Sequence, residues 1–275
     1  MEKINFIKIK EVDLDNLKIC DKCGKPKQII RISSDGESHV FPIRCECEER
    51  EYQARKQAEL KAQQEFELKL KAEKLRNNGI TVKQYHDWTF ENDDNLTPDI
   101  TAKIKAYIRD FPKKKLTGEG LLLYGAVGTG KTYYAMCIAN ALIDKGVKVL
   151  ATSLAEIVRQ LRDFNKAESR FNTLMQYQLI VLDDLGTESA MPSTMEIIYQ
   201  VIDGWTSRNI PLVITTNLTP SVFEQAANGD ASVDTARVSS RILEKCQPIK
   251  VNAVKRRDLK MKQNREKWKV ENNGN

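Results

Sequence analysis

One short stretch near the middle of the chain restricts the fold more than any other. Residues 121–124 are apolar and run directly into a glycine-rich turn, which begins at Gly125 and ends in Lys131 and Thr132 with the spacing G-x-x-x-x-G-K-T. A buried strand, a glycine turn and a helix in this order form a phosphate-binding loop, because the N–H groups of the turn and the positive end of the helix dipole face an anion. We therefore predict a nucleoside triphosphate site here rather than an ordinary glycine turn.

Each part of this turn has a predicted task. The glycines permit backbone conformations that a Cβ atom excludes, so that successive N–H groups can point at phosphate oxygens. Lys131 is predicted to contact the β- and γ-phosphates, and Thr132 to bind Mg²⁺. ATP and Mg²⁺ are therefore the expected cofactors. The predicted nucleotide-binding residues are Gly125, Ala126, Val127, Gly128, Thr129, Gly130, Lys131 and Thr132.

The second half of the chain alternates apolar runs with helical segments. Strands that are apolar on both faces need helices on both faces, which predicts an α/β fold with a parallel sheet. The five predicted strands are residues 121–124, 147–152, 178–182, 210–215 and 248–251. The predicted helices are residues 131–145, 153–164, 193–207, 221–227 and 233–244, two of them opened by S-x-x-E capping boxes at Ser153 and Ser193.

Polar side chains stand where two of these strands end. Asp183 and Asp184 follow residues 178–182, and Asn217 follows residues 210–215. Ligands bind beyond the carboxyl ends of parallel strands. We expect Asp183 to hold Mg²⁺, Asp184 to orient or deprotonate the attacking water, and Asn217 to contact that water or the γ-phosphate. A polar strand end commonly serves only as a turn or helix cap, but together with the glycine turn these residues favour a catalytic site.

Four of the six cysteines cluster near the N-terminus, as Cys20-x-x-Cys23 and Cys45-x-Cys47. Four thiolates bind Zn²⁺ tetrahedrally in closed structural sites, so we predict a zinc module with a hairpin between the two pairs. The second pair is tighter than C-x-x-C, and His39 could replace one cysteine as a ligand. Four free structural cysteines are the alternative, although so small a segment has few apolar residues to stabilise it otherwise.

Residues 46–77 are rich in Glu, Lys, Gln, Ala, Arg and Leu and contain neither Pro nor Gly, which predicts a long charged helix. Its apolar residues are too sparse for a heptad repeat, so we interpret it as a semi-rigid connector. An aromatic group follows in the entry to the next domain. These side chains either line an adenine pocket or pack against the domain; they are Tyr85, His86, Trp88 and Phe90.

The charge distribution says less about function than these motifs do. The net charge is +6, and residues 255–269 hold eight Lys or Arg against two acidic residues, which suits a polyanion or a solvated tail. No apolar run approaches the roughly 18 residues of a membrane span, and residues 1–8 do not have the pattern of a signal peptide. We therefore expect a cytoplasmic protein without a membrane partner.

These motifs together resemble a known family. Gly125–Thr132, Leu182–Gly186, Ile214–Asn217 and Arg237–Ile242 are similar to the corresponding segments of the DnaC/DnaI type of AAA+ protein, the bacterial and phage replicative-helicase loaders, with the transposition helper IstB as a near relative. The resemblance implies an AAA+ ATPase domain at residues 79–254. It would follow a zinc-binding module at 1–47 and a helical connector at 48–78, and precede a basic tail at 255–275.

The resemblance also implies partners and further site residues. The zinc module would contact a hexameric replicative helicase, and the ATPase domain would bind single-stranded DNA. Arg241 matches the arginine finger that reaches the γ-phosphate of a neighbouring subunit in an ATP-dependent oligomer, with Arg237 as the second choice. Asp184 stands where most AAA+ ATPases have the longer Glu, which implies slow hydrolysis used as a switch. The alternatives are an IstB-like transposition helper acting on duplex DNA with a transposase, and a small-molecule phosphotransferase.

Overall fold

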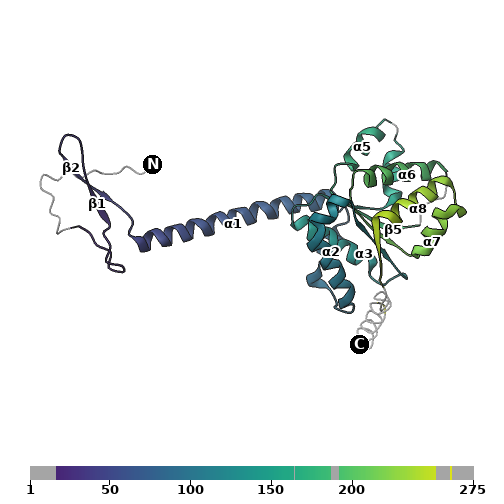
Figure 1. Ribbon diagram of the computed structural model, residues 1–275, viewed down its shortest axis with the longest axis horizontal. Coiled ribbons are helices and arrows are strands. Elements are labelled where there is room, and N and C mark those ends of the chain that lie inside the picture. The colour runs from purple at the N-terminus through teal and green to yellow at the C-terminus, as the bar shows by residue number, and fades with distance from the viewer. Residues whose placement is uncertain (1–16, 164, 187–191, 252–260, 262–275) are drawn as a thin grey trace, which may run out of the picture. The chain divides into compact units, whose positions relative to one another are not determined.

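The computed structural model describes residues 17–163, 165–186, 192–251 and 261 (Figure 1). Its contacts divide the chain into two units, Met1–Glu67 and Leu68–Asn275. Within the described residues, no helix combines the length and apolar character needed to cross a membrane. The predicted tail at 255–275 lies outside the described residues except for Met261. The four-part division of the chain stays a prediction.

A hairpin stands between the two cysteine pairs in the first unit, as predicted. Strands β1 (Gln28–Ile32) and β2 (Ser38–Pro42) are antiparallel, with Gln28 opposite Pro42 and Ile32 opposite Ser38. The turn is closed at Ser33, whose N–H donates to the carbonyl of Glu37 at 2.8 Å. Gly36 has a φ of +82°, a conformation that favours glycine.

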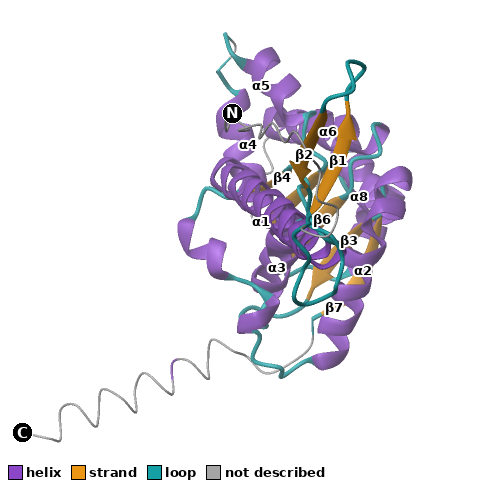
Figure 2. Cartoon of the chain, turned by 90° about the vertical axis from the view of Figure 1, so that its left-hand side faces the viewer, coloured by secondary structure: helices purple, strands orange, loops and turns teal. Residues whose placement is uncertain are grey.

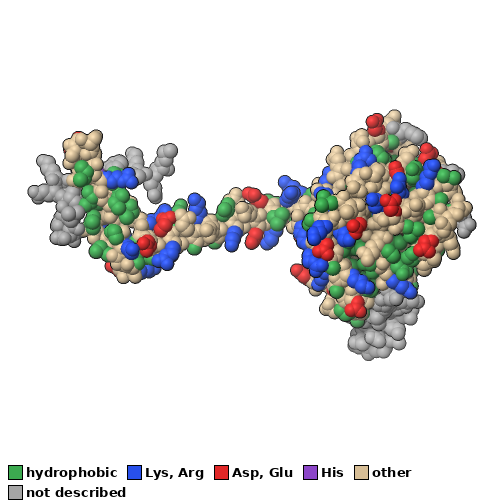
Figure 3. All heavy atoms as spheres, in the orientation of Figure 1, with side chains coloured by type: hydrophobic (Ala, Val, Ile, Leu, Met, Phe, Trp, Pro, Cys, Tyr) green, Lys and Arg blue, Asp and Glu red, His purple; other side chains and the backbone are tan. Residues whose placement is uncertain are grey.

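Helix α1 (Glu46–Gly79) matches the predicted charged helix and its predicted end. Basic and acidic side chains alternate along its surface (Figure 3). At Gly79 the chain passes so close to strand β4 (Val149–Thr152) that a Cβ atom would lie 2.0 Å from the carbonyl oxygen of Val149. The next residue, Ile80, forms a parallel bridge with Ala151 and is 1% exposed.

The second unit contains a sheet of five parallel strands in the order β4-β5-β6-β3-β7, which confirms the predicted fold class. In chain order the strands are β3 (Gly120–Tyr124), β4 (Val149–Thr152), β5 (Leu179–Leu185), β6 (Leu212–Thr216) and β7 (Cys246–Lys250). Strand β7 begins two residues before the predicted strand, and β5 continues through Asp183 and Asp184.

Helices cover both faces of this sheet (Figure 2). The helices are α2 (Pro98–Thr117), α3 (Lys131–Asp144), α4 (Leu154–Leu161), α5 (Ala167–Leu174), α6 (Pro192–Ser207), α7 (Pro220–Gln225) and α8 (Val233–Lys245). Successive residues of β3 divide between two cores: Leu121 and Leu123 pack with α2 and α3, whereas Leu122 packs with α4, α6 and α8. Short helical turns are η2 (Lys83–Asp87), η3 (Phe90–Asn92) and η4 (Ala226–Asp230). Because side chains alternate across a strand, a sheet buried on both faces requires the continuous apolar runs seen in the sequence.

Two helices, α2 and α5, are not among those predicted from the sequence. The signal for α2 was present: Ile100, Ile104, Ile108 and Phe111 recur every three or four residues, and all four are buried. Pro98 at the start of the helix is compatible with helix because its missing N–H would have no partner there. Pro112 inside the helix weakens the pattern.

Two helix boundaries differ from those predicted. The hydroxyl of Ser153 accepts a hydrogen bond from the N–H of Glu156 at 3.3 Å, which confirms the cap of α4, but this helix ends at Leu161 rather than at residue 164. Helix α6 begins at Pro192, so Ser193 lies inside the helix and the second predicted capping box is wrong.

Candidate functional site

The glycine turn connects β3 to α3 with three glycines in conformations that few other residues adopt. Their φ angles are +148° at Gly125, +82° at Gly128 and +97° at Gly130. A Cβ atom at Gly125 would also lie 2.6 Å from the carbonyl oxygen of Val251, which follows the neighbouring strand β7. The turn is closed internally by the hydroxyl of Thr129, which donates to the carbonyl of Ala126 at 2.9 Å. The predicted loop thus lies at the carboxyl end of the sheet, closed by its own hydrogen bond.

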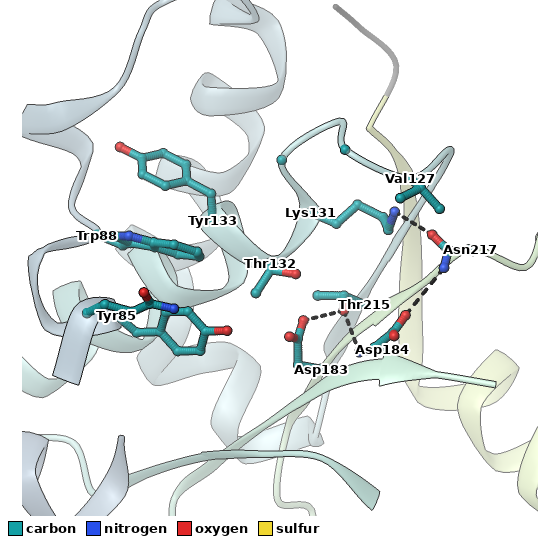
Figure 4. Close-up of a pocket in the computed structure, with 13 residues that line it drawn as sticks. Tyr85, Trp88, Val127, Lys131, Thr132, Tyr133, Asp183, Asp184, Thr215 and Asn217 are labelled. Carbon is teal, nitrogen blue, oxygen red and sulfur yellow. Dashed lines mark hydrogen bonds between the residues drawn. The ribbon is translucent and has the colours of Figure 1, made fainter. Parts of the chain in front are cut away.

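Lys131 is the first residue of α3 and is 7% exposed. Its Nζ atom donates to the carbonyl oxygens of Gly125 and Ala126, each at 2.9 Å, and to Oδ1 of Asn217 at 2.8 Å (Figure 4). The lysine therefore joins the glycine turn to the end of β6. It faces a cavity of about 590 Å³ lined by Gln84, Tyr85, Trp88, Val127, Gly128, Gly130, Lys131, Thr132, Tyr133, Asp183, Asp184, Thr215 and Asn217.

The two aspartates meet the same cavity from β5. Oδ1 of Asp184 accepts a hydrogen bond from Nδ2 of Asn217 at 3.3 Å, so Asn217 lies between Asp184 and Lys131 (Figure 4). The structure therefore brings together Lys131, Thr132, both aspartates and Asn217, which come from the first turn of α3 and from the ends of β5 and β6. This set of oxygen ligands and one cation fits a triphosphate with Mg²⁺.

Thr215 also belongs to this site, although it is not among the residues predicted from the sequence. Its hydroxyl donates to Oδ1 of Asp183 at 2.7 Å and accepts from the N–H of Asp184 at 2.8 Å. The residue is 1% exposed. It stands inside the Ile214–Asn217 segment that carried the family resemblance, but its contacts depend on how β5 and β6 align, which the sequence does not reveal.

Two of the four aromatic residues that precede α2 face the cavity. Tyr85 and Trp88 line the cavity, and they also pack against the core beside α3. Their ring centroids are 4.5 Å apart, and Trp88 lies 5.7 Å from Tyr133. Desolvation, and to a smaller extent the charge of Asp183, raises the pKa of Tyr85. These rings form an apolar wall beside the glycine turn.

The other two aromatic residues of that segment do not line the cavity. The Nε2 atom of His86 lies 2.8 Å from the carbonyl oxygen of Ile80, and Phe90 packs against the core. Of the four, therefore, only Tyr85 and Trp88 are placed to meet a nucleotide.

The two arginines considered as fingers lie on α8 and do not line this chain's cavity. Arg241 forms ion pairs with Asp203 at 3.1 Å and with Glu244 at 3.4 Å, and its side chain is 43% exposed. Arg237 pairs with Asp234 at 3.7 Å and lies over the ring of Tyr199 at 5.3 Å. Both guanidinium groups are therefore partly accessible and held by surface ion pairs.

The four N-terminal cysteines converge in the first unit. The sulfur atoms of Cys20, Cys23, Cys45 and Cys47 lie within 4.8 Å of one another, and His39 is not part of the cluster. Neighbouring sulfurs are 3.1 to 3.5 Å apart. Backbone N–H groups of Cys23 and Lys22 lower the pKa of the Cys20 thiol to about 6, whereas hydrogen bonds with Cys45 and Cys20 raise the pKa of the Cys47 thiol to about 12. The metal-free cluster therefore favours a thiolate at Cys20 alongside a protonated Cys47. This donor set fits a structural zinc ion, with all four ligands from cysteine.

A family model described as IstB-like ATP binding protein matches residues 49–266. The chain belongs to this family. The match includes the glycine turn, both aspartates, Asn217 and the two arginines of α8. The description of this family states ATP binding.

Several curated proteins are similar to this family member. The replicative helicase loader DnaI of Bacillus subtilis (strain 168) is 31% identical over 182 residues, which are 62% of this chain and 58% of that protein. The replicative helicase loader DnaC of Escherichia coli (strain K12) is 27% identical over 121 residues, 42% of this chain and 48% of that protein. A putative insertion sequence ATP-binding protein of Sinorhizobium fredii is 30% identical over 103 residues, 36% of this chain and 34% of that protein. The chain thus spans less than two thirds of the length of each.

Two solved structures share the fold of this IstB-like protein. The crystal structure of DnaI superposes with a TM-score of 0.52 at 22% identity and covers 64% of this chain and 93% of that chain. The crystal structure of the DnaC helicase loader gives 0.52 at 21% identity, covering 62% of this chain and all of that chain. At these identities the likeness concerns the fold.

Proposed function

We propose that this protein is an ATP-dependent loader of a replicative DNA helicase. The observation that carries the proposal is the convergence of Lys131, the aspartate pair and Asn217 on one cavity in a chain that also gathers four cysteines. The family match supports ATP binding, and the similarity to DnaI and DnaC supports the class of partner.

The glycine turn would hold the triphosphate, with Lys131 exchanging its bonds to loop carbonyls for bonds to the β- and γ-phosphates. Tyr85 and Trp88 would contact the base. Thr132 and Asp183 would hold Mg²⁺, which neutralises charge on the phosphates. Positioning and charge neutralisation then supply most of the catalysis.

For hydrolysis, Asp184 would accept a proton from a water whose oxygen attacks the γ-phosphorus. The bond between that phosphorus and the β–γ bridging oxygen breaks, and ADP and phosphate leave. Asn217 would orient the water or the γ-phosphate. The short side chain of Asp184 gives a slow reaction, which suits a switch between two assembly states.

The remaining parts of the proposal concern partners. The zinc module would bind the hexameric helicase, and Arg241, or Arg237 in its place, would reach the nucleotide of an adjacent copy in an ATP-dependent oligomer. Basic residues of the assembled ATPase domains would bind single-stranded DNA, so that binding weakens as salt rises. We propose that this occurs in the cytoplasm, where such helicases act.

A second function, a helper ATPase of transposition acting on duplex DNA, is favoured by one observation. The matching family model is named for IstB, and the similar proteins include insertion sequence ATP-binding proteins. The four-cysteine cluster favours the loader, because it supplies a separate partner-binding module.

Co-purification tests the choice between the two. The full chain is mixed with the host's hexameric replicative helicase, with and without ATP, and complexes are separated by gel filtration. A stable complex that is lost when Cys20 and Cys23 are replaced by Ser supports the loader. Absence of any complex, together with tight binding to duplex DNA and no effect on helicase loading, supports the transposition helper.

A further inference from the structure

The alignment of β5 with β6 changes at the aspartate pair. The two parallel strands pair Leu182 with Ile214 and then Leu185 with Thr216, with a register shift between these pairs. Two residues of β5, Asp183 and Asp184, are therefore opposed by the single residue Thr215 of β6. This is a β-bulge, a feature that redirects side chains and is common beside active sites.

The hydroxyl of Thr215 bridges the two bulged residues. It donates to the carboxylate of Asp183 at 2.7 Å and accepts from the backbone N–H of Asp184 at 2.8 Å (Figure 4). Asp184 has a φ of +60°, a left-handed conformation that is uncommon outside glycine and needs support from its surroundings. One side chain thus engages a carboxylate oxygen of the first aspartate and the strained backbone of the second.

A hydroxyl has one hydrogen and two lone pairs, so this arrangement uses it as a donor and an acceptor at once. Its hydrogen engages only one oxygen of Asp183, which leaves the second oxygen for a cation. Its bond to the N–H of Asp184 holds the backbone that directs this side chain toward Asn217. Thr215 is buried between the strands, so water cannot readily replace these bonds.

We propose that Thr215 is a positioning residue of the nucleotide site, whose hydroxyl orients Asp183 for Mg²⁺ and holds Asp184 in its left-handed conformation. The inference rests on the magnesium and ATP site of the proposed function, and it is independent of any helicase. Groups that orient metal ligands typically change metal affinity or activity by about 10- to 100-fold when removed.

The neighbouring residue offers a matched control. Thr216 is also buried, and its hydroxyl likewise donates and accepts, but to the carbonyl of Leu185 at 2.7 Å and from the N–H of Leu218 at 3.1 Å. Thr215→Val and Thr216→Val each remove one buried hydroxyl from the same strand at nearly constant volume. Only the first removes a contact with a carboxylate.

The experiment measures binding of a fluorescent non-hydrolysable ATP analogue, first in EDTA and then as Mg²⁺ is added. We expect Thr215→Val to bind within about twofold of the wild type in EDTA and to need at least roughly tenfold more Mg²⁺ for half-maximal tightening. Thr215→Ser should stay within about threefold of the wild type because it keeps the hydroxyl. Thr216→Val should keep the wild-type Mg²⁺ requirement even if its melting temperature falls.

Three results overturn the inference: a wild-type Mg²⁺ requirement in Thr215→Val, an equal defect in Thr215→Ser, or an equal defect in Thr216→Val. If Thr215→Val does not fold, as judged by its thermal transition, Thr215→Ala and Thr215→Ser provide the same comparison. A wild-type chain without Mg²⁺-dependent nucleotide binding overturns this inference and the nucleotide site of the proposed function together. Failure to load a helicase, with the Thr215 effect intact, refutes the loading proposal alone.

Discussion

Nζ of Lys131 donates a hydrogen bond to Oδ1 of Asn217 at 2.8 Å across 86 residues of sequence. The lysine begins the helix after β3, and the asparagine follows β6, the strand beside it in the sheet. Asn217 also donates to Asp184, so one amide connects the phosphate-binding lysine with the second aspartate. A change at the γ-phosphate position would therefore alter the contacts of both Lys131 and Asp184.

Removing the lysine should abolish nucleotide binding. Lys131→Ala loses a cation whose hydrogen bonds to phosphate are charge-assisted, and we expect the affinity for ATP to fall by roughly 100-fold or more. Binding is measured by fluorescence of a labelled nucleotide. Lys103→Ala removes an exposed lysine of α2 and serves as the control, which should bind normally. Normal ATP affinity in Lys131→Ala would contradict the assignment of the glycine turn.

Two substitutions of Asn217 should separate binding from hydrolysis. Asn217→Ala removes the contact with Asp184 and the acceptor for Lys131, so kcat should fall by about 10- to 100-fold with KM for ATP changed by less than about threefold. Asn217→Asp instead puts a carboxylate in place of the amide that donates to Asp184 at 3.3 Å, beside Lys131, where its charge repels phosphate. We expect its KM to rise by at least roughly tenfold. Both kcat and KM are measured by steady-state ATP hydrolysis. Equal effects of Asn217→Ala and Asn217→Asp on these constants would contradict a role of Asn217 at the γ-phosphate.

The arginine finger is tested by mixing two variants. Arg241→Ala should bind ATP normally but assemble and hydrolyse poorly, because its guanidinium would act on the nucleotide of an adjacent copy. Its ion pairs with Asp203 and Glu244 are exposed, and such pairs contribute only about 0–1 kcal/mol to stability. The guanidinium group can therefore leave these partners at little cost in free energy. Mixtures of Arg241→Ala with Lys131→Ala should hydrolyse more ATP than either variant alone.

Unchanged hydrolysis by the Arg241→Ala oligomer would exclude Arg241. The same assay on Arg237→Ala then tests the second choice. Arg159→Ala, which removes an exposed arginine of α4, is the control for loss of surface charge.

Loss of zinc should unfold one unit only. Replacing Cys20 and Cys23 by Ser removes two of four sulfurs, and a small module with a partly exposed hairpin has little core to replace the metal. We expect no bound zinc by atomic absorption, loss of helicase binding, and an unchanged thermal transition of the ATPase domain. His39→Ala should retain zinc, because His39 is outside the cluster. A folded, helicase-binding variant without zinc would contradict the prediction.

The features predicted correctly from the sequence are those that a short stretch of neighbouring residues specifies. The glycine turn and the cap at Ser153 depend on contacts within a few residues, and each strand was recognised from its own apolar run. Helix α2 shows the limit of such reasoning. Its apolar spacing was visible, but two prolines and the absence of a motif obscured it.

The sequence by itself determined the type of site, since a G-x-x-x-x-G-K-T turn after an apolar strand leaves the backbone few alternatives, and it determined the family. Only the tertiary structure decided that Thr215 contacts both aspartates, that Lys131 meets Asn217, and that Tyr85 and Trp88 line the cavity while His86 and Phe90 do not. These contacts depend on strand order and on one register shift. Strand pairing joins residues far apart in the chain, so no local pattern specifies it.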